Sequence, residues 1–586
     1  MTGFQNQVLS AATAGFLAHW CYFVHGEHDL QAAHIAQTHI VLCILVAGAK
    51  GYVEGLTFSN ACRETMTLAA IYVGIMMTSI AVYRLFFSPL RRFPGSFSWK
   101  LSKLSHVWSM TKPDNFKVLE RERQKYGDIV RTGPNEITLF TVEAFHQVYN
   151  SQSNCTKSPY YDLLQPMESL DTTRDPAMHT RRRKIWDQFF SVRCKPTPAL
   201  SLEKQEGLVY SYGDKLVAAI EKRVNEPLDV SDWFEYYTFD LMGQFGMGFD
   251  FGLLEGQPND IHHLYHIAHR NLGPIGAAPW MKHLMMSIPY IERLRSYRLF
   301  LQWTTNLLQN KIESKSEIKD VLGYVVEDAR RNGGFQAEWR FMMGDLALLI
   351  AAGSDPMRLA LTNIFYYLVV YPEHLRQVRN ELAQIDWRDY KALARLDHLS
   401  AVIYETLRLN PPVPAAGLRI TPPEGLTLST AHIPGGTTVL VPQYSLFRGK
   451  YALAPPNRLS ASLFQPPNLC TASLNEELTR LSVSDPRNFA QPNDFLPERF
   501  TTRPELILDE DAYMPWSAGK GQCIGKKLSL LEIRVAVAAV VTRFDVGFAP
   551  GEDGTRMFAE TVDYFTSTPG PLRLVFKERE AKREAM

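Results

Sequence analysis

The chain has 586 residues, 46% of them apolar, and a formal net charge of +1. This composition predicts a globular body with an apolar core and gives no bulk electrostatic reason for nucleic-acid binding. The cysteines have no paired spacing, which argues against a disulfide framework or a cysteine-based zinc site and favours a reducing compartment; they are Cys21, Cys43, Cys62, Cys155, Cys194, Cys470 and Cys523.

Three apolar stretches open the chain, at about residues 4–25, 38–56 and 65–87. They predict a membrane-anchor region over residues 1–87 with up to three transmembrane helices. Charged or polar residues interrupt or edge the first two stretches, so a buried hairpin or an interfacial pair of helices is the alternative for them.

The third stretch carries no charge from Thr65 to Tyr83 and is followed directly by the basic residues Arg84, Arg91 and Arg92. Because a basic flank stays in the cytosol, the large body of the chain that follows is expected to be cytosolic. Residues 88–96 contain two prolines and are expected to form a stiff linker that cannot continue the helix.

The body of the chain is expected to be mainly helical, with short strands at 128–133 and 136–140. Residues 178–191 combine a basic run with aromatic side chains, which by itself is typical of a solvated helix face. Residues 344–370 are apolar almost throughout and predict a buried helix. Pro356 removes one N–H from this helix and is expected to kink it, since the carbonyl of Ala352 loses its partner.

Several shorter patterns complete the body. Glu405 and Arg408 share one helix face, where alone they would be an ordinary surface ion pair. Residues 413–418 are expected as a strand, and residues 433–441 and 564–575 as hairpins. Residues 449–480 are polar, contain prolines and lack periodicity, so they are expected to be a disordered surface insertion or a retained intron.

Cys523 stands between glycines, just ahead of a helical pattern that runs from Lys527 to about Phe544. The unpaired N–H groups and positive dipole at a helix N-terminus favour a thiolate that ligates metal or acts as a nucleophile. The alternative for a lone cysteine is a small buried apolar side chain.

The segment from Trp516 to Gly525 resembles the haem-binding loop of the cytochromes P-450, whose pattern is aromatic-x-x-Gly-x-Arg-x-Cys-x-Gly. Trp516, Gly519, Cys523 and Gly525 match, and Gly521 stands where the family has arginine. The resemblance covers about residues 88–580 and implies a mainly α (α+β) catalytic domain, followed by a polar tail at 581–586. It also implies a haem b whose iron is ligated by Cys523.

The central helix resembles the distal helix of that family, whose pattern is Ala/Gly-Gly-x-Asp/Glu-Thr. Ala352, Gly353 and Asp355 match, but Pro356 replaces the threonine hydroxyl. The resemblance leaves Ser354 and Asp355 as candidate proton-relay groups beside an opened backbone at Pro356. The alternative is that Pro356 is merely a tolerated kink.

The resemblance assigns two further sets of charged side chains. The Glu-x-x-Arg pattern at Glu405 and Arg408 implies a buried structural network with Arg499. Candidates to hold the haem propionates share a cationic or imidazole head group; they are His179, Arg183, Arg419 and Lys520. Residues 233–290 and 565–568 are expected to contact substrate.

The implied activity is insertion of one oxygen atom of O2 into an apolar small molecule, with a fungal secondary metabolite as the expected substrate. Loosely similar proteins hydroxylate indole alkaloids. Electrons are expected from NADPH through a separate NADPH-cytochrome reductase, and the protein is expected in the bilayer of the endoplasmic reticulum. A cationic docking face for the reductase is expected from Lys520, Lys526, Lys527 and Arg534. The alternatives are a haem-thiolate dehydratase or isomerase, which the missing threonine permits, and a catalytically impaired relic.

Overall fold

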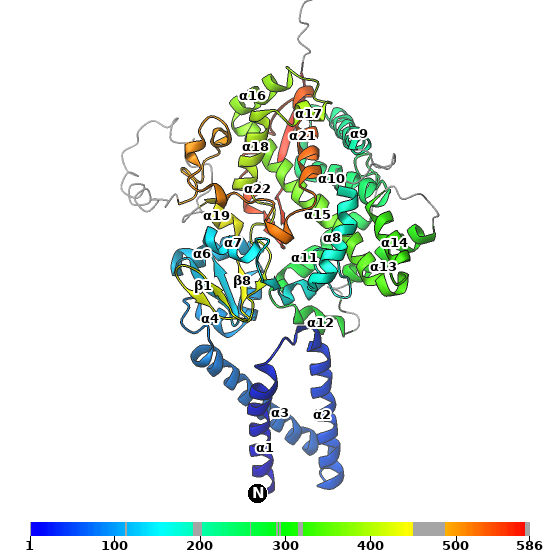
Figure 1. Cartoon of the computed structure of the whole chain (residues 1–586). Helices are drawn as coiled ribbons and strands as arrows, with labels where there is room; N and C mark the ends of the chain where they lie inside the picture. Colours follow the sequence, from blue (N-terminus) through cyan, green and yellow to red (C-terminus); the bar gives the residue numbers. More distant parts are fainter. Residues whose placement is uncertain are drawn as a thin grey trace, which may run out of the picture.

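Three N-terminal helices project from a large helical body in the computed structural model (Figure 1). They are α1 (Thr2–Ala18), α2 (Ala32–Val53) and α3 (Phe58–Val82), and single π-helical turns extend α1 and α3 to Phe23 and Phe87. The structure describes residues 2–111, 114–190, 202–257, 260–288, 291, 295–313, 320–448 and 487–579. The insertion predicted at 449–480 and the tail at 581–586 lie outside these residues.

Two of the N-terminal segments, Asp29–Val53 and Phe58–Phe87, are long and apolar enough to cross a membrane, and the predicted stretch at 4–25 is not among them. Apolar side chains on α2, among them Ile40 and Ile44, are more than half exposed, as expected of a helix that lipid would cover. These two segments support membrane anchoring.

Lys50 shows how the charges in these stretches are accommodated. Its Nζ donates to Gln7 Oε1 at 2.6 Å and Glu64 Oε2 at 2.8 Å, and it also contacts Glu54 Oε2 at 3.4 Å. The three N-terminal helices therefore satisfy this ammonium between themselves, at their ends remote from the body (Figure 1).

The largest sheet has the strand order β1-β2-β8-β5-β3. The predicted strands at 128–133 and 136–140 form its antiparallel edge pair, β1 (Ile129–Gly133) and β2 (Glu136–Leu139). Strand β8 (Thr438–Leu440) runs parallel to β2 and antiparallel to β5 (Arg419–Ile420), which pairs with β3 (Thr156–Lys157).

Three strand predictions were wrong. Residues 413–418 form turns, and the strand begins only at Arg419. Residues 433–441 are not a hairpin, because β7 (His432–Ile433) pairs with β6 (Leu426–Thr427) whereas β8 joins the large sheet. At the C-terminus the hairpin is β10 (Val562–Asp563) and β11 (Ser567–Thr568); β12 (Arg573–Glu578) instead pairs with β4 (Pro227–Asp229) and β9 (Phe544–Phe548).

Helices make up most of the body. Those that build the site are α8 (Pro176–Phe190), α10 (Val230–Met247), α11 (Asp260–Leu272), α15 (Phe335–Val370), α18 (Asp397–Leu409) and α21 (Lys526–Arg543). The others are α4 (Phe97–Leu101), α5 (Lys103–Ser109), α6 (Asn115–Tyr126), α7 (Val142–Tyr149), α9 (Leu202–Glu221), α12 (Trp280–Met286), α13 (Arg295–Glu313), α14 (Val321–Arg331), α16 (Pro372–Leu382), α17 (Tyr390–Leu393), α19 (Gln443–Arg448) and α22 (Thr555–Ala559).

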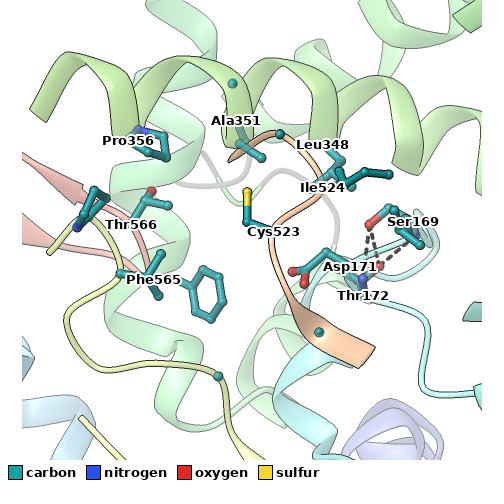
Figure 2. A pocket seen from close by; sticks show the side chains of 18 of the residues that line it. Ser169, Asp171, Thr172, Leu348, Ala351, Pro356, Cys523, Ile524, Phe565 and Thr566 are labelled. Carbon is teal, nitrogen blue, oxygen red and sulfur yellow. Dashed lines mark hydrogen bonds between the residues drawn. The ribbon is translucent and has the colours of Figure 1, made fainter. Parts of the chain in front are cut away.

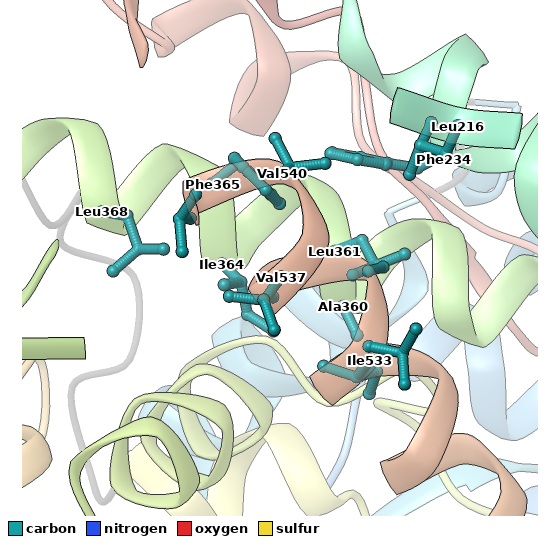
Figure 3. Packing of buried hydrophobic residues seen from close by; sticks show 14 of the residues in the cluster. Leu216, Phe234, Ala360, Leu361, Ile364, Phe365, Leu368, Ile533, Val537 and Val540 are labelled. Atoms are coloured by element: carbon teal, nitrogen blue, oxygen red, sulfur yellow. The ribbon is translucent and has the colours of Figure 1, made fainter. Parts of the chain in front are cut away.

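The centre of the core is the contact between α15 and α21. Ile364 of α15 and Val537 of α21 are fully buried in one cluster, and Leu361 lies beside them (Figure 3). The predicted buried helix at 344–370 thus exists, begins earlier at Phe335, and continues as one helix through Pro356. Its apolar surface is covered by protein on all sides along this part, as the sequence pattern requires.

Candidate functional site

A cavity of about 470 Å³ lies where α8, α11, α15, the loop before α21 and the β10–β11 hairpin meet. Aromatic and aliphatic side chains line most of it, including Leu163, Leu348 and Phe565. Figure 2 shows the Cys523 sulfur pointing into this space, toward the part of α15 that carries Ala351. The cavity is thus mostly apolar, and the thiol of Cys523 faces its interior.

The sequence before α21 explains how Cys523 is presented. Its backbone N–H donates to the Trp516 carbonyl at 3.0 Å, which closes the loop. Gly519 has a φ of +60°, and a Cβ there would lie 2.4 Å from the Asn150 backbone, so only glycine allows this close approach. The loop therefore ends with the cysteine just ahead of the first turn of α21.

The thiol of Cys523 faces opposing influences. Burial raises its pKa, whereas hydrogen bonds from the backbone N–H groups of Gly525 and Lys526 and the positive charge of Arg183 act in the opposite direction. Protein surrounds the cysteine on most sides, and its exposed surface opens to the cavity. A cationic metal centre in the cavity would add to the groups that favour the thiolate.

Cations gather along one side of the cavity. Strands β3 and β5 place Lys157 directly opposite Arg419, and both side chains line the cavity together with Arg183 and His179. Burial lowers the pKa of Lys157 to about 8. Burial, with nearby Lys157 and Arg183, lowers the pKa of His179 to about 4. Like charges in direct register are unfavourable by themselves, so this arrangement suits a bound anionic group.

Arg419 also bears on the glycine that stands where the resemblance expects arginine. A Cβ at Gly521 would lie 3.3 Å from Arg419 Nη2, so the guanidinium of Arg419 already occupies the space next to position 521. Its Nη1 donates to Tyr161 Oη at 2.9 Å, which fixes its direction. A cation is therefore present at this point although residue 521 has no side chain.

The candidate relay residues on α15 differ in whether they line the cavity. Pro356 lines the cavity, whereas Ser354 and Asp355 are buried behind its wall. Among the described residues the Ser354 hydroxyl has no hydrogen-bond partner. Asp355 Oδ2 accepts a hydrogen bond from Tyr265 Oη at 2.7 Å and a longer one from Thr566 Oγ1 at 3.4 Å. Tyr265 and Thr566 both line the cavity, so each connects it to the carboxylate.

Glu405 and Arg408 of α18 and Arg499, in the 3-10 helix Pro497–Phe500, form a fully buried cluster. Arg408 binds the carboxylate with two hydrogen bonds, of 2.7 and 2.8 Å, and Arg499 Nε donates to the same carboxylate at 3.0 Å. The remaining N–H groups of both guanidiniums donate to carbonyls, including those of Phe447 and Ala490. Paired and hydrogen-bonded in this way, the charges tolerate burial.

Two predicted cations lie elsewhere than expected. Lys520 is exposed and does not line the cavity. Arg534 is buried, and its Nη2 donates to Ser400 Oγ at 3.2 Å, so it is not part of a docking surface. This assignment was wrong because α21 is packed on all sides at that turn, which the charged side chain alone did not indicate. Lys526 and Lys527 are exposed.

Sequence reasoning missed Lys157, Tyr265 and, as a partner of Asp355, Thr566. Nothing in the local sequence marks Lys157, since its position opposite Arg419 follows from strand pairing. Thr566 was expected at the cavity within the range 565–568, and the structure places only Phe565 and Thr566 of that range on the wall. From the range 233–290, Met242, Tyr265, Ala268 and Gly273 line it.

The site combines a cysteine ahead of a helix with an apolar cavity and a group of cations, in a mainly helical protein. A family model described as cytochrome P-450 matches residues 94–466 and 481–576. The chain therefore belongs to the cytochrome P-450 family and is an oxidoreductase, which confirms the fold and the family expected from the motifs.

Known relatives extend along almost the whole chain. A cytochrome P-450 monooxygenase of Aspergillus versicolor is 31% identical over 564 residues, covering 95% of each protein. Tryprostatin B 6-hydroxylase of Aspergillus fumigatus is 29% identical, covering 95% of this chain and 93% of that protein. The structure of retinoic acid-bound cyanobacterial CYP120A1 has a TM-score of 0.62 at 18% identity, over 83% of this chain and 99% of that one, and shows the same fold.

The residues present fit the haem that the family implies. The cavity offers a sulfur that faces its interior and, on one side, the cations Lys157, Arg183 and Arg419. A dicarboxylate with an apolar ring system and a thiolate-binding metal matches this set of groups.

We expect Glu405→Ala to destabilise the protein strongly, because Arg408 and Arg499 would be left as uncompensated buried charges. The expected loss is about 3–5 kcal/mol of unfolding free energy, which would be measured as a lower thermal midpoint and a lower yield of folded protein. Glu505→Ala is the matched control, since Glu505 is exposed and has one long contact to Arg503. Equal midpoints for the two variants would contradict this account.

Proposed function

We propose that this chain is a membrane-anchored haem-thiolate monooxygenase that inserts one oxygen atom of O2 into an apolar small molecule. The observation that carries the proposal is the Cys523 sulfur, held ahead of α21 and directed into an apolar cavity beneath α15. Haem b bound in this cavity would supply the activation of oxygen, with Cys523 as the axial ligand of its iron.

The cationic side of the cavity holds the propionates in this proposal. Arg183 and Arg419 present guanidiniums, which suit carboxylates, and Lys157 adds a compact charge. Burial and the nearby cations lower the pKa of His179 to about 4, and its ring N–H can donate a hydrogen bond to a carboxylate. Arg419 takes the place of the arginine that residue 521 lacks.

The substrate meets the apolar part of the wall. Phe565 stacks on Tyr160 with ring centroids 5.7 Å apart, and Leu348 and Ala351 face the cavity from α15 (Figure 2). Burial of an apolar ligand against such a surface gains roughly 25 cal/mol per Å². The relative that hydroxylates tryprostatin B supports a fungal secondary metabolite as the substrate class.

The proton path of this proposal uses a hydroxyl from another part of the chain. Pro356 has no hydroxyl, but Thr566, in the turn between β10 and β11, lies beside it (Figure 2). Thr566 Oγ1 donates to Asp355 Oδ2, and Tyr265 donates to the same oxygen. Thr566 therefore passes a proton between the cavity and the buried carboxylate of Asp355.

Electrons reach the site from NADPH through a separate reductase in this proposal. Lys520, Lys526 and Lys527 are exposed around the start of α21 and offer a cationic surface to an acidic partner. The two apolar segments near the N-terminus hold the catalytic body on the cytosolic side of the endoplasmic reticulum.

The test of the proposed function is made on the full-length protein in detergent. We expect a thiolate-type band in the reduced carbon monoxide spectrum, and a product that requires NADPH and reductase and carries 18O from labelled O2. Product formed without NADPH would instead identify a dehydratase or isomerase. A protein without the thiolate band would be the impaired relic, and either result would overturn the proposal.

Arg419→Gln is expected to speed the loss of haem. Removing a charge-assisted hydrogen bond costs about 1.5–3 kcal/mol, which corresponds to roughly 10- to 100-fold in the rate of haem transfer to an acceptor protein. Lys520→Gln is the control, because Lys520 is exposed outside the cavity, and its rate is expected to be unchanged. A rate of haem loss in R419Q no faster than in K520Q would remove Arg419 from the propionate site.

Thr566→Val keeps the shape of the side chain and removes its hydroxyl. We expect the fraction of NADPH electrons recovered in product to fall about 100-fold, the lower end of what a positioned proton donor contributes, while haem content stays constant. Thr568→Val, in the same hairpin but off the cavity wall, is the matched control. Unchanged coupling in T566V would show that water carries the proton without this residue.

A further inference from the structure

A second group of ligating side chains lies outside the haem cavity. Glu235 extends from α10, and His262 and His266 extend from one face of α11, four residues apart. One ligand atom of each residue, an imidazole nitrogen or a carboxylate oxygen, lies within 4.8 Å of the other two. None of the three residues lines the cavity.

The three ligand atoms lie close together, with the Glu235 carboxylate in contact with both imidazoles. His262 Nε2 lies 2.9 Å from Glu235 Oε1, and His266 Nε2 contacts the same oxygen. All three atoms are shielded from solvent, and none has an aligned hydrogen-bond partner among the described residues. Two imidazole nitrogens and one carboxylate oxygen within 4.8 Å of one another are a ligand set that zinc accepts, with a fourth position left for water.

The surroundings orient these ligands. Arg358 of α15 contacts Glu235 Oε2 and lies 3.2 Å from Asp232 Oδ1, so the guanidinium occupies one oxygen of Glu235 and leaves Oε1 for the imidazoles. Two carboxylates and one guanidinium give this site a net negative charge, which a cation would offset. The imidazole of His262 is held edge-on by Phe239, with ring centroids 5.3 Å apart.

The histidine side of this site lies near the protein surface. The side chains of His262 and His266 are 18% and 28% exposed, whereas Glu235 is 2% exposed. The ligand atoms are therefore covered, with the two histidines near the surface and the carboxylate deeper in the protein.

We propose that Glu235, His262 and His266 bind one divalent transition-metal ion of the zinc class, which ties α11 to α10. The ion would also stabilise the cavity wall, because Tyr265 and Ala268 of the same helix line the cavity. Tyr265 lies between the two histidines in the sequence, and Ala268 follows them. This site is independent of the proposed monooxygenase activity, since it uses none of the residues assigned to haem or substrate.

The test uses the full-length, haem-loaded protein in detergent, treated with EDTA, dialysed and titrated with ZnCl2. Equilibrium dialysis with elemental analysis is expected to show one saturable zinc per chain, and zinc is expected to raise the thermal midpoint. His262→Gln and His266→Gln are each expected to weaken zinc binding by at least the roughly 100-fold that loss of an outer-shell partner can cost.

His263→Gln is the matched control, because His263 is an exposed residue of the same helix, and its zinc affinity is expected to equal that of the unmodified protein. Glu235→Gln removes one of the two carboxylates that contact Arg358 and could impair folding, so the histidine variants decide the question. The proposal is overturned if the unmodified protein binds no zinc, which would make the cluster a carboxylate held by two imidazolium groups. Equal zinc affinity in H262Q, H266Q and H263Q would overturn it as well.

Discussion

The packing of α15 against α21 is the constraint on which the rest of the structure depends. Both helices are buried along their contact, with Ile364 and Val537 in one cluster (Figure 3). Because buried, close-packed helices cannot slide without opening voids, their relative position is rigid. The start of α21 presents Cys523, and the preceding part of α15 carries Ala351 and Pro356 over it (Figure 2). The packing of the two helices therefore fixes how far the cysteine loop at the start of α21 lies from α15.

The two groups of buried charged side chains near the site differ in whether they are neutralised within the chain. Arg408 and Arg499 both bind Glu405, and their other N–H groups donate to carbonyls. The hydrogen bonds of this network are therefore all made within the chain. In the cavity, Lys157 and Arg419 lie in direct register, and with Arg183 they outnumber the nearby carboxylate of Asp171. The first arrangement stabilises the fold, and the second is suited to an anionic ligand.

The two departures from the family pattern have a common physical character. Position 521 lacks a cation, and Arg419 occupies the adjacent space from strand β5. Position 356 lacks a hydroxyl, and Thr566 reaches the neighbouring carboxylate from the β10–β11 hairpin. In both cases a chemical group missing from one segment is present nearby on another, which is why neither departure by itself argues for a relic.

The sequence by itself determined those features whose cause is local. Apolar periodicity and length were enough for the helix at 344–370 and for the two membrane-spanning candidates, and the glycines around Cys523 were enough for a cysteine presented at a helix start. These patterns are local because a helix satisfies its backbone hydrogen bonds within one segment, and a tight turn depends on its own glycines.

Only the tertiary structure decided the pairings between distant segments. Strand β8 does not form the predicted hairpin, because it pairs with β2 and β5, which come from other parts of the chain. Arg534 is buried because other parts of the protein surround α21 at that turn. The positions of Lys157 opposite Arg419, of Thr566 on Asp355, and of Glu235 against His262 have the same origin. Which side chains meet across elements depends on how whole helices and strands pack, and no window of sequence contains that information.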